Sequence, residues 1–376
     1  MSRAKAAATE NVMSRIVARA TKEGGEGLRR LGDKPLQEVA SMTTGSLGLD
    51  MALGVGGWAR GRVVEIYGQE AVGKTTLLLH TIAAEQRAGG CVAFIDAEHA
   101  LDTKYAAHLG VDTDNLYVMQ PSTAEEALDV TCNLCEATLA EKQALEAAAA
   151  AEKRPADLSG MLSLIIVDSV AALVPKAELE GEVADSQVAL VARMMGKALR
   201  KLTPSAAQSG VTVIFINQQR MKINAGHGSP WTTTGGNALK FYTSMRVQLT
   251  NIGQIKAGEE KVGNRVKANV IKNKVAAPFI EVEYDVMKGE GIDRGGEVID
   301  LCVDHGILKA KGAWLYYGEK TLAQGRPAAK ALLRDKPELM AELEGKVRES
   351  VRQYGLKGPG KKSKKDAAAD SAVEAE

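Results

Sequence analysis

The sequence predicts an α/β protein built on a doubly wound, mostly parallel β-sheet. Short, continuous apolar runs at residues 162–167 and 211–216 are typical of strands buried on both faces. Helical patterning separates such runs along the chain, as at residues 75–87, where Gly89 and Gly90 then stop the helix. Because strands alternate with helices, neighbouring strands are expected to run parallel and to be joined by crossover helices.

Further segments complete the predicted sheet in chain order. Residues 62–67 precede the first predicted helix and residues 91–95 follow it, and both are rich in apolar and β-branched residues. Three later strand-like segments, 245–250, 265–272 and 279–286, have no long helices between them. We therefore expect these three to extend the sheet as antiparallel members.

Composition divides the chain into four parts. Residues 1–35 are polar and rich in Ala and Arg, with weak helical patterning, and form a predicted N-terminal helical segment. Residues 36–293 carry the predicted sheet and end in a cluster of glycines. Residues 294–356 form a small α/β lobe. Residues 357–376 hold five lysines followed by four acidic residues, a low-complexity tail that we expect to be disordered.

Bulk composition is that of an ordinary globular chain of 376 residues, 45% hydrophobic and 25% charged. Lys plus Arg is 48 and Asp plus Glu is 47, so any affinity for nucleic acid must come from local clusters. The longest apolar stretch, residues 161–175, is interrupted by Asp168 and is too short to span a bilayer. The first ten residues lack a signal-peptide core, and four cysteines favour a reducing compartment. We expect a cytoplasmic protein with no membrane association.

Two features in the middle of the chain carry no visible chemistry. Residues 138–160 contain an Ala/Glu/Lys-rich run that favours helix and that Pro155 ends. Cys132 and Cys135 form a lone CxxC within a helical run. Without a second ligand pair, a metal or redox role for these cysteines is disfavoured.

The phosphate-binding loop is the most specific motif in the sequence. Residues 68–75, GQEAVGKT, match G-x-x-x-x-G-K-[ST], directly after a predicted strand and at the start of a predicted helix. Backbone N–H groups and the helix N-terminus would surround phosphates, and Lys74 would reach the β and γ phosphates of ATP. The Thr75 hydroxyl would bind Mg²⁺. A chance match in a Gly-rich loop is the weaker interpretation, so the sequence predicts a P-loop NTPase.

Two acids are candidates for the rest of this site. Asp168 ends the apolar strand 162–167, where a second Mg²⁺-side carboxylate is expected. Glu98 follows strand 91–95, at the sheet edge where ligands bind, and is placed to activate the attacking water. By position alone, Glu98 is equally well explained as a solvated loop acid. Asp96 lies closer to the strand and has a structural role as its alternative.

Seven segments in this order resemble the RecA family of bacterial recombinases, over about residues 46–292. The matching segments are FIDAEHALD (94–102), VDSVAAL (167–173), PKAELEG (175–181), ARMM (192–195), FINQ (215–218), TTTGGNALKFY (232–242) and KNKVAAPF (272–279). The resemblance implies a RecA-like P-loop core that hydrolyses ATP with Mg²⁺ in a DNA-dependent manner. It also implies filaments on single-stranded DNA, pairing with homologous double-stranded DNA, and strand exchange.

The resemblance also assigns roles to individual residues. Glu98 would be the catalytic glutamate, and Gln218 would sense the γ-phosphate and relay that state to the DNA loops. Lys272 and Lys274 would reach the ATP of a neighbouring subunit, and a charge supplied in this way stabilises the transition state. Tyr105 would stack on adenine. The nucleotide-binding residues implied are Gly68, Gln69, Glu70, Ala71, Val72, Gly73, Lys74, Thr75, Thr76, Asp102 and Tyr105.

A predicted helix at residues 188–202 forms one candidate DNA surface. Its apolar residues fall on one side at helical spacing, whereas Arg193, Lys197 and Arg200 lie at i, i+4 and i+7 on the other side. Such a row suits a phosphate backbone, although a solvated helix face is the more common explanation of this pattern. The resemblance places Arg193 and Arg200 on single-stranded DNA and so favours the DNA surface.

A long Gly/Thr/Asn-rich segment at residues 221–237 forms the second candidate DNA surface, because loops of this length inside a domain are usually functional or disordered. In the family this is the second DNA-binding loop, here called loop two. An apolar wedge and backbone donors would hold DNA without reading its sequence. The loop-two residues implied are Met221, Lys222, Ile223, Gly235, Gly236 and Asn237.

The chain departs from the family's usual sequence at several places. Loop two has His227 and Trp231, Gln187 and Val188 replace a His-Met pair, and Ala71 and Val72 replace serines. Residues 138–160 are extra length, and the tail is less acidic than usual. The predicted catalytic groups are unaffected, whereas DNA-to-ATP coupling, strand-exchange efficiency and regulation by the tail are open.

Three other functions are weaker interpretations. A hexameric-ring helicase should lack both the 232–242 motif and the Lys272/Lys274 pair. A filament protein that has lost strand exchange is supported only by Trp231, Gln187 and Val188. A small-molecule kinase has no recognisable acceptor pocket. Cleavage of a LexA-type repressor and packing of residues 1–35 on the neighbouring subunit are implied by the resemblance alone.

Overall fold

The computed structural model describes residue 16 and residues 39–181, 188–221, 231–356 and 358. The chain divides into two compact units, Met1–Val39 and Ala40–Glu376, and every helix and strand bounded below lies in the second. Of the predicted N-terminal segment 1–35 and tail 357–376, only Ile16 and Gly358 fall within these ranges, and the predicted domain boundaries stay predictions.

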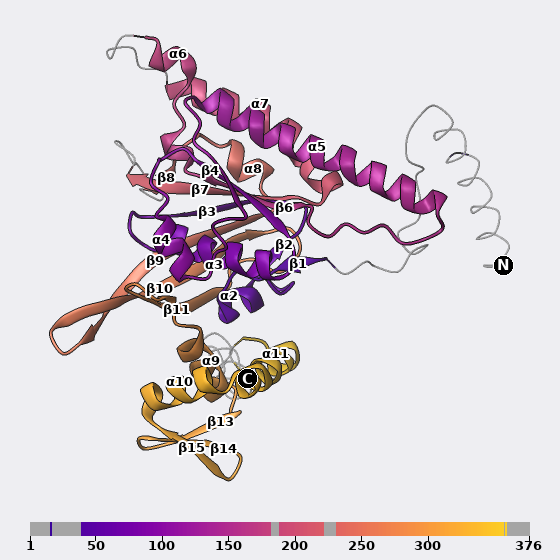
Figure 1. Cartoon of the computed structure of the whole chain (residues 1–376). Coiled ribbons are helices and arrows are strands. Elements are labelled where there is room, and N and C mark those ends of the chain that lie inside the picture. The colour runs from indigo at the N-terminus through magenta and orange to yellow at the C-terminus, as the bar shows by residue number, and fades with distance from the viewer. Residues whose placement is uncertain (1–15, 17–38, 182–187, 222–230, 357, 359–376) are drawn as a thin grey trace, which may run out of the picture. The chain divides into compact units, whose positions relative to one another are not determined.

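A ten-stranded sheet forms the centre of the described part of the chain (Figure 1). Its order is β12-β11-β10-β9-β3-β7-β6-β4-β5, with β8 paired to β7. Six neighbouring strands, from β9 to β5, run parallel, which confirms the predicted mostly parallel sheet. The strands are β3 (Val63–Gly68), β4 (Cys91–Asp96), β5 (Leu116–Met119), β6 (Leu162–Asp168), β7 (Thr212–Met221), β8 (Trp231–Thr233), β9 (Met245–Ala257), β10 (Glu260–Asn273), β11 (Glu281–Met287) and β12 (Gly291–Ile292).

Helices cover both faces of this sheet, and the strand side chains alternate between them. Ile214 and Ile216 of β7 belong to the apolar cluster that contains α3 (Lys74–Arg87) and α4 (Thr103–His108). Val213 and Phe215 belong to the cluster that contains α5 (Ala124–Ala151) and α7 (Val188–Ser209). A parallel strand buried on both faces therefore needs a continuous apolar run, which is the pattern that predicted it.

The expectation of three antiparallel strands is wrong for the first of them. β9 runs parallel to β3, and only β10, β11 and the short β12 are antiparallel to their neighbours. The connection from β7 to β9 contains loop two and the short helix α8 (Ala238–Tyr242). It is long enough to bring the chain back to the end of the sheet where the parallel strands begin, so β9 can run parallel to β3. β9 and β10 continue beyond the sheet as a hairpin, visible at the lower left of Figure 1.

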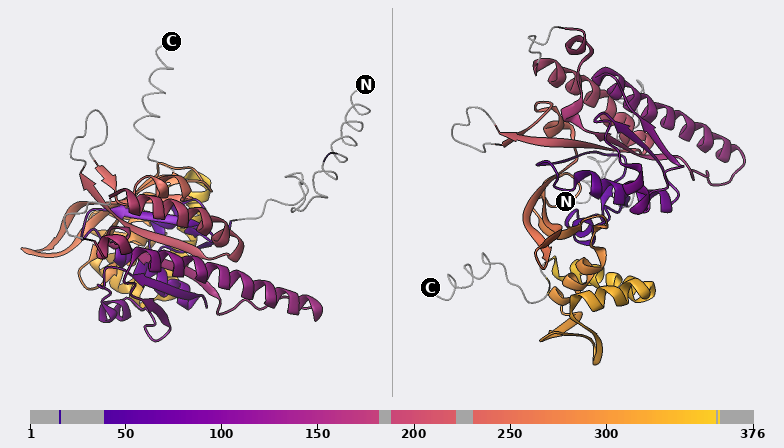
Figure 2. Two further views of the ribbon diagram at one scale, coloured as in Figure 1. Left: turned by 90° about the horizontal axis from the view of Figure 1, so that it is seen from above. Right: turned by 60° about the vertical axis from the view of Figure 1, so that its left-hand side comes forward.

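The extra residues from 138 onward lengthen α5, which runs without a break to Ala151. Its helix lies beside α7 on the same face of the sheet (Figures 1 and 2). Cys132 and Cys135 lie on the inner side of α5, 3% and 0% exposed, and burial raises the pKa of Cys135 to about 12. Buried, protonated thiols of this kind serve packing, as the sequence interpretation favours.

The C-terminal lobe follows β12 and has its own apolar cluster. Its elements are α9 (Arg294–Asp304), β13 (Leu308–Lys311), β14 (Trp314–Tyr317), β15 (Lys320–Gln324), α10 (Gly325–Asp335) and α11 (Pro337–Tyr354). Glu297 of α9 is buried and accepts hydrogen bonds from Ser46 Oγ (2.5 Å) and from the backbone N–H groups of Leu47 and Gly48. These bonds fix the lobe to the start of α2 (Leu47–Ala52).

The remaining short elements are β1 (Ser41–Met42), β2 (Trp58–Ala59), the 3-10 helix η2 (Val170–Ala172) and α6 (Lys176–Leu179). Over the described residues, none of the helices has the length and hydropathy needed to cross a membrane.

Candidate nucleotide site and DNA-facing surface

The phosphate loop connects the end of β3 to the start of α3, as its motif predicts. Gly73 precedes the helix with φ of 90°, a left-handed conformation that favours glycine, and no side chain caps the helix. The first N–H groups of α3 are therefore left for another acceptor. A helix N-terminus in this state, behind a Gly-rich loop, fits a phosphate group.

Lys74 is buried within the loop that it follows. Its Nζ atom donates to the carbonyl oxygens of Gln69 (2.7 Å) and Gly68 (3.4 Å). Burial lowers the pKa of the Lys74 amine, and the charges of Asp168 and Glu98 oppose this shift. A buried ammonium held only by neutral carbonyls gains most from a nearby anion.

Thr75 and Asp168 meet beside the phosphate loop, with the Thr75 hydroxyl donating to Asp168 Oδ2 at 2.9 Å. Burial is the main cause that raises the pKa of Asp168 to about 6, while the bond from Thr75 opposes it. In the described residues no group of three or more His, Cys, Asp or Glu could hold a metal. The two oxygen donors fit Mg²⁺, which takes few protein ligands and completes its shell with water and substrate phosphates.

Glu98 follows the end of β4 by two residues. It is hydrogen-bonded to β7, the strand on the other side of β6. Its Oε1 atom accepts from Gln218 Nε2 (3.2 Å) and from the Ser169 hydroxyl. Gln218 belongs to β7, so two residues predicted to act in catalysis are in direct contact. Asp96, by contrast, has a structural role, because it accepts hydrogen bonds from the backbone N–H of Ala100 and from Gln120 Nε2.

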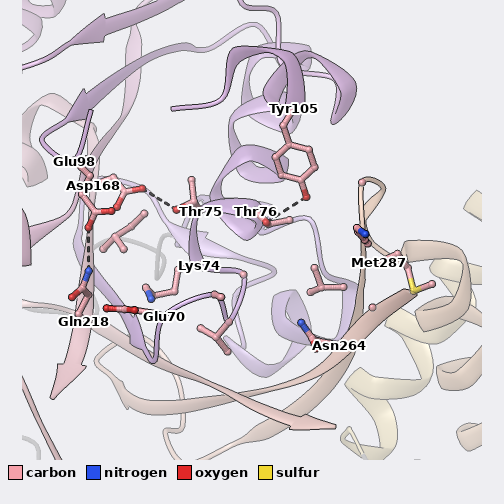
Figure 3. Close-up of a pocket in the computed structure, with 18 of the residues that line it drawn as sticks. Glu70, Lys74, Thr75, Thr76, Glu98, Tyr105, Asp168, Gln218, Asn264 and Met287 are labelled. Carbon is pink, nitrogen blue, oxygen red and sulfur yellow. Dashed lines mark hydrogen bonds between the residues drawn. The ribbon is translucent and has the colours of Figure 1, made fainter. Parts of the chain in front are cut away.

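A cavity of about 830 Å³ joins these groups. Figure 3 shows Glu98, Asp168 and Gln218 on one side of it and Tyr105 on another. Tyr105 and Thr76 approach one another, with 3.4 Å between their hydroxyl oxygens. Asp102 caps α4 by accepting from the backbone of Lys104 and Tyr105, so it orients the helix that carries the tyrosine.

The far wall of the cavity was missed by sequence reasoning. It comes from the antiparallel strands, more than 180 residues after the phosphate loop, and includes Lys261, Gly263, Asn264, Met287, Lys288 and Gly289. A Cβ atom on Gly263 would lie 2.6 Å from the carbonyl oxygen of Val286, so β10 and β11 need glycine to approach closely here. The glycines after β11 were interpreted only as a domain boundary.

The predicted row of cations lies on the exposed side of α7. Arg193, Lys197 and Arg200 are exposed, whereas Met195 and Leu202 are buried against the sheet. None of the three cations forms an ion pair within the described ranges, although Lys201 beside them pairs with Glu136 of α5 at 3.0 Å. The amphipathic arrangement predicted from the sequence is therefore confirmed for this helix.

The two ends of loop two form a short antiparallel pair, in which β8 returns along the end of β7. Gly235 and Gly236 follow with φ of 79° and 73°, where a Cβ would lie 2.9 Å from Val170 Cγ1 and 2.8 Å from Ala192 Cβ. The returning end of loop two, at Gly235 and Gly236, is thus packed closely on η2 and α7. Asn237 precedes α8 and accepts from Lys240.

Several predicted features of this region lie outside the described residues. They are Lys222, Ile223, His227 and Gln187. Met221 ends β7, Val188 begins α7, and Trp231 begins β8.

Lys272 lies near the end of β10, and Lys274 follows the strand directly. Among the described residues, neither lysine lines the cavity at this chain's own phosphate loop. Lys272 Nζ donates to the carbonyl oxygens of Lys240 (2.7 Å) and Phe241 (3.1 Å) of α8. Burial, followed by the charges of Lys274 and Arg246, lowers the pKa of Lys272 to about 8. A partly desolvated ammonium of this kind is suited to an anion that another molecule brings.

A phosphate loop between a central parallel strand and its helix, with an acid at the end of a nearby strand, makes this chain a P-loop NTPase. The model of the RecA N-terminal domain matches residues 9–154 and 139–293, and that of the RecA C-terminal domain matches residues 296–352. The chain belongs to the RecA family. The two N-terminal matches overlap in the second half of α5, as expected if these residues are extra length.

Individual relatives agree over most of the chain. Protein RecA of Methylobacterium radiotolerans is 52% identical over 87% of this chain and 84% of its own length. Protein RecA of Rubrobacter xylanophilus is 49% identical over 91% and 92%. Protein RecA of Geobacter sulfurreducens is 48% identical over 96% and 98%. As a member of this family, the chain is a DNA-dependent ATPase of homologous recombination and repair that binds nucleotide, binds DNA and forms filaments.

Proposed function

We propose that the nucleotide cavity binds ATP and that hydrolysis there controls how α7 and loop two hold DNA. One observation carries the proposal: β7 bears Gln218, which donates to Glu98 in the nucleotide cavity, and ends three residues later at Met221, where loop two begins. A rigid strand with one end in each site is a direct physical connection between them.

Phosphate binding in this proposal uses groups that await an anion. The N–H groups at the start of α3 and the loop backbone from Gly68 to Gly73 would accept the phosphates. Lys74 would exchange its carbonyl partners for β- and γ-phosphate oxygens, a change from neutral to charge-assisted bonds. Thr75 and Asp168 would hold Mg²⁺, which screens phosphate charge when bound.

Glu98 is the proposed base that orients and deprotonates the attacking water. Ser169 and Gln218 both donate to one of its oxygens, which fixes the carboxylate and leaves the second oxygen to accept from water. Tyr105 would lie against the adenine ring, with Asp102 holding α4 in place. On this proposal Gln218 also reports the presence of the γ-phosphate to loop two.

DNA binding in this proposal is independent of base sequence. Arg193, Lys197 and Arg200 would contact phosphates of single-stranded DNA, and the backbone of Gly235, Gly236 and Asn237 would hold others. Ile223 would wedge between base triplets, and Met221 and Lys222 would contact the DNA beside it. Because none of these contacts reads a base edge, any strand can be paired with homologous duplex DNA and exchanged.

Assembly completes the proposed function. Lys272 and Lys274 would reach the ATP of the next subunit in the filament, and residues 1–35 would pack on that neighbour. The filament would stimulate cleavage of a LexA-type repressor in the response to DNA damage. A cytoplasmic location is proposed as well, because all four cysteines are free.

Two assays on the purified full-length protein test this proposal. ATP hydrolysis is measured with and without saturating single-stranded DNA, and strand exchange is measured with circular single strands and linear duplex. We expect hydrolysis to depend on single strands and exchange to depend on ATP. Equal hydrolysis rates with and without DNA would contradict the proposal.

Glu98→Gln tests the assigned base. We expect ATP to bind as before, because the phosphate contacts remain, while hydrolysis falls on the order of 10²- to 10⁴-fold. Equilibrium binding of a labelled nucleotide and steady-state hydrolysis measure the two quantities separately. Normal turnover in this variant would assign the base to another residue.

A further inference from the structure

A buried polar cluster in the middle of the sheet has no part in the chemistry described above. Glu65 of β3 and Asn217 of β7 are fully buried, and Arg246 of β9 is 8% exposed. Glu65 and Arg246 are partners in the β3–β9 register, and Arg246 Nε donates to Glu65 Oε2 at 2.5 Å. The other oxygen, Oε1, accepts from Asn217 Nδ2 at 2.9 Å.

Buried groups of this kind are retained at a cost in stability unless all of them find partners. Here Glu65 has one partner on each oxygen, so the carboxylate is satisfied by Arg246 and Asn217 together. An apolar set of similar volume would fill the same space with less desolvation. A role beyond packing must therefore come from what else these side chains contact.

Asn217 is the member with contacts outside the cluster. Its Nδ2 atom donates to the carbonyl oxygen of Thr234 at 3.0 Å as well as to Glu65. Its Oδ1 atom accepts from the backbone N–H of Gln218 at 2.8 Å. One amide thus joins the centre of the sheet, the main chain of Gln218 and the returning end of loop two.

The position of Asn217 in the strand explains why these contacts matter. β7 pairs with β3 up to Gln218, and from Gln219 onward it pairs with β8 instead. Asn217 therefore lies where β7 leaves the central sheet and enters loop two. A displacement of the Gln218 backbone at this point acts on Oδ1 of the same amide whose Nδ2 group holds the carbonyl of Thr234.

The returning end of loop two has few other side-chain ties among the described residues. The hydroxyls of Thr233 and Thr234 are buried and have no hydrogen-bond partner within residues 39–181, 188–221 and 231–356. Gly235 and Gly236, which follow, are held by close packing on Val170 and Ala192. The bond from Asn217 to Thr234 is thus a side-chain link between this segment and the strand that enters the nucleotide site.

We propose that Asn217 is a positioning residue that transmits the state of Gln218 to loop two through the carbonyl of Thr234. The inference rests on the proposed function, because it needs Gln218 to respond to the γ-phosphate. Glu65 accepts from the amide of Asn217 and so holds it in a fixed orientation, and a shift of the Gln218 backbone therefore moves loop two.

The test compares Asn217→Ala with Arg246→Lys, both in a Trp314→Phe background. Arg246→Lys is the matched control: it weakens the same cluster but contacts neither Thr234 nor Gln218. Trp231 at the start of β8 then reports on loop two, because Trp58 is fully buried elsewhere. Affinity for a non-hydrolysable ATP analogue, the emission change that the analogue causes, and stimulation of hydrolysis by single strands are measured.

In Asn217→Ala we expect analogue affinity to be kept, because Asn217 does not line the cavity, while the analogue-induced change in Trp231 emission disappears. The stimulation by single-stranded DNA should fall roughly tenfold or more, the usual size of a coupling between sites. Arg246→Lys should keep both responses although its melting temperature falls. Asn217→Ser, with a smaller void, replaces Asn217→Ala if the latter does not fold.

Two results would overturn the inference. One is a wild-type response of Trp231 and of hydrolysis in the Asn217 variant. The other is a loss of response in Arg246→Lys as large as in Asn217→Ala at equal loss of melting temperature, which would make the cluster merely structural. If the parent protein itself shows no stimulation by DNA, the proposed function fails instead, and the two failures are thereby distinguished.

Discussion

The nucleotide site and the DNA-facing surface differ in how far the chain itself completes them. In the nucleotide site, Lys74, Thr75, Glu98 and Asp168 all have hydrogen-bond partners within the protein. On the proposed DNA-binding side, the cations of α7 are exposed, and two hydroxyls at the end of loop two are buried with no hydrogen-bond partner in the described parts of the chain. The first site is ready for its ligand, whereas the second is completed by it, so single substitutions should act differently on the two.

The largest expected effect is at the ready-made site. Lys74→Ala removes the one cation inside the phosphate loop, so ATP turnover should fall on the order of 10²- to 10³-fold. Steady-state hydrolysis with saturating single strands measures this effect. Lys142→Ala, on the outer part of α5, is the control and should hydrolyse ATP normally. Turnover within tenfold of the parent would show that the phosphate loop is misassigned.

A smaller effect is expected where loop two is seated on α7. Gly236→Ala places a Cβ 2.8 Å from Ala192 Cβ at a φ of 73°, and the strain of about 1–3 kcal/mol should lift loop two from α7. Affinity for single-stranded DNA should fall roughly tenfold while affinity for ATP is kept. Fluorescence anisotropy of a labelled oligonucleotide measures the change.

The control for this variant is Gly210→Ala. Gly210 has φ of 86° but nothing within 4 Å of an added Cβ, so it carries the backbone strain without the clash. If both variants weaken DNA binding equally, the close packing of loop two on α7 has no part in holding DNA.

A still smaller effect is expected for one exposed cation. Arg200→Ala should weaken DNA binding uniformly across sequences and lower the salt slope of log Kd by about 1. Lys201→Ala removes the adjacent charge, which is already paired with Glu136, and should leave the slope unchanged. A slope equally insensitive to both variants would make the cationic face of α7 an ordinary solvated surface.

The smallest effect concerns Lys272, whose pKa of about 8 lies below the usual value for lysine because burial disfavours its charged form. As the pH rises through 8 this amine loses its charge, and about half of it is neutral at that pH. Labelling by an amine-acylating reagent, followed by mass spectrometry of the DNA-free protein, should reach half its maximum near pH 8 at this residue. Half-maximal labelling only above pH 10 would contradict the effect of burial.

The contiguous phosphate loop could be predicted from the sequence, whereas parts of the site that come from distant strands could not. The phosphate loop is one contiguous motif on a strand and a helix, and the continuous apolar runs of β6 and β7 indicate burial on both faces. The far wall of the cavity was not predictable in this way, because Asn264 and Met287 come from antiparallel strands that meet the loop only in the folded sheet. The direction of β9 was not predicted correctly for a related reason. The sequence of a strand indicates which of its faces are buried but not whether it runs parallel or antiparallel to its neighbour.

Contacts between side chains of distant strands were also beyond the sequence. Asn217 lies inside the FINQ segment that carried the family resemblance, yet nothing in that segment indicates that its amide bonds to Thr234 and Glu65. The sequence shows only that Asn217 is a polar residue within an apolar run. Such a residue is expected to be buried and hydrogen-bonded, but the sequence does not identify its partner.

Strand β10 has a consequence for cooperation between subunits. At Asn264 it lines the chain's own nucleotide cavity, and eight residues on, at Lys272, it ends in the amine proposed for the next subunit's triphosphate. A strand of that length covers about 26 Å at 3.3 Å per residue. Each protomer would then contact two successive ATP molecules through residues of one β-strand, which pairs with β9 on one side and β11 on the other. Such a connection favours sequential ATP hydrolysis in neighbouring subunits along the filament over hydrolysis at random positions.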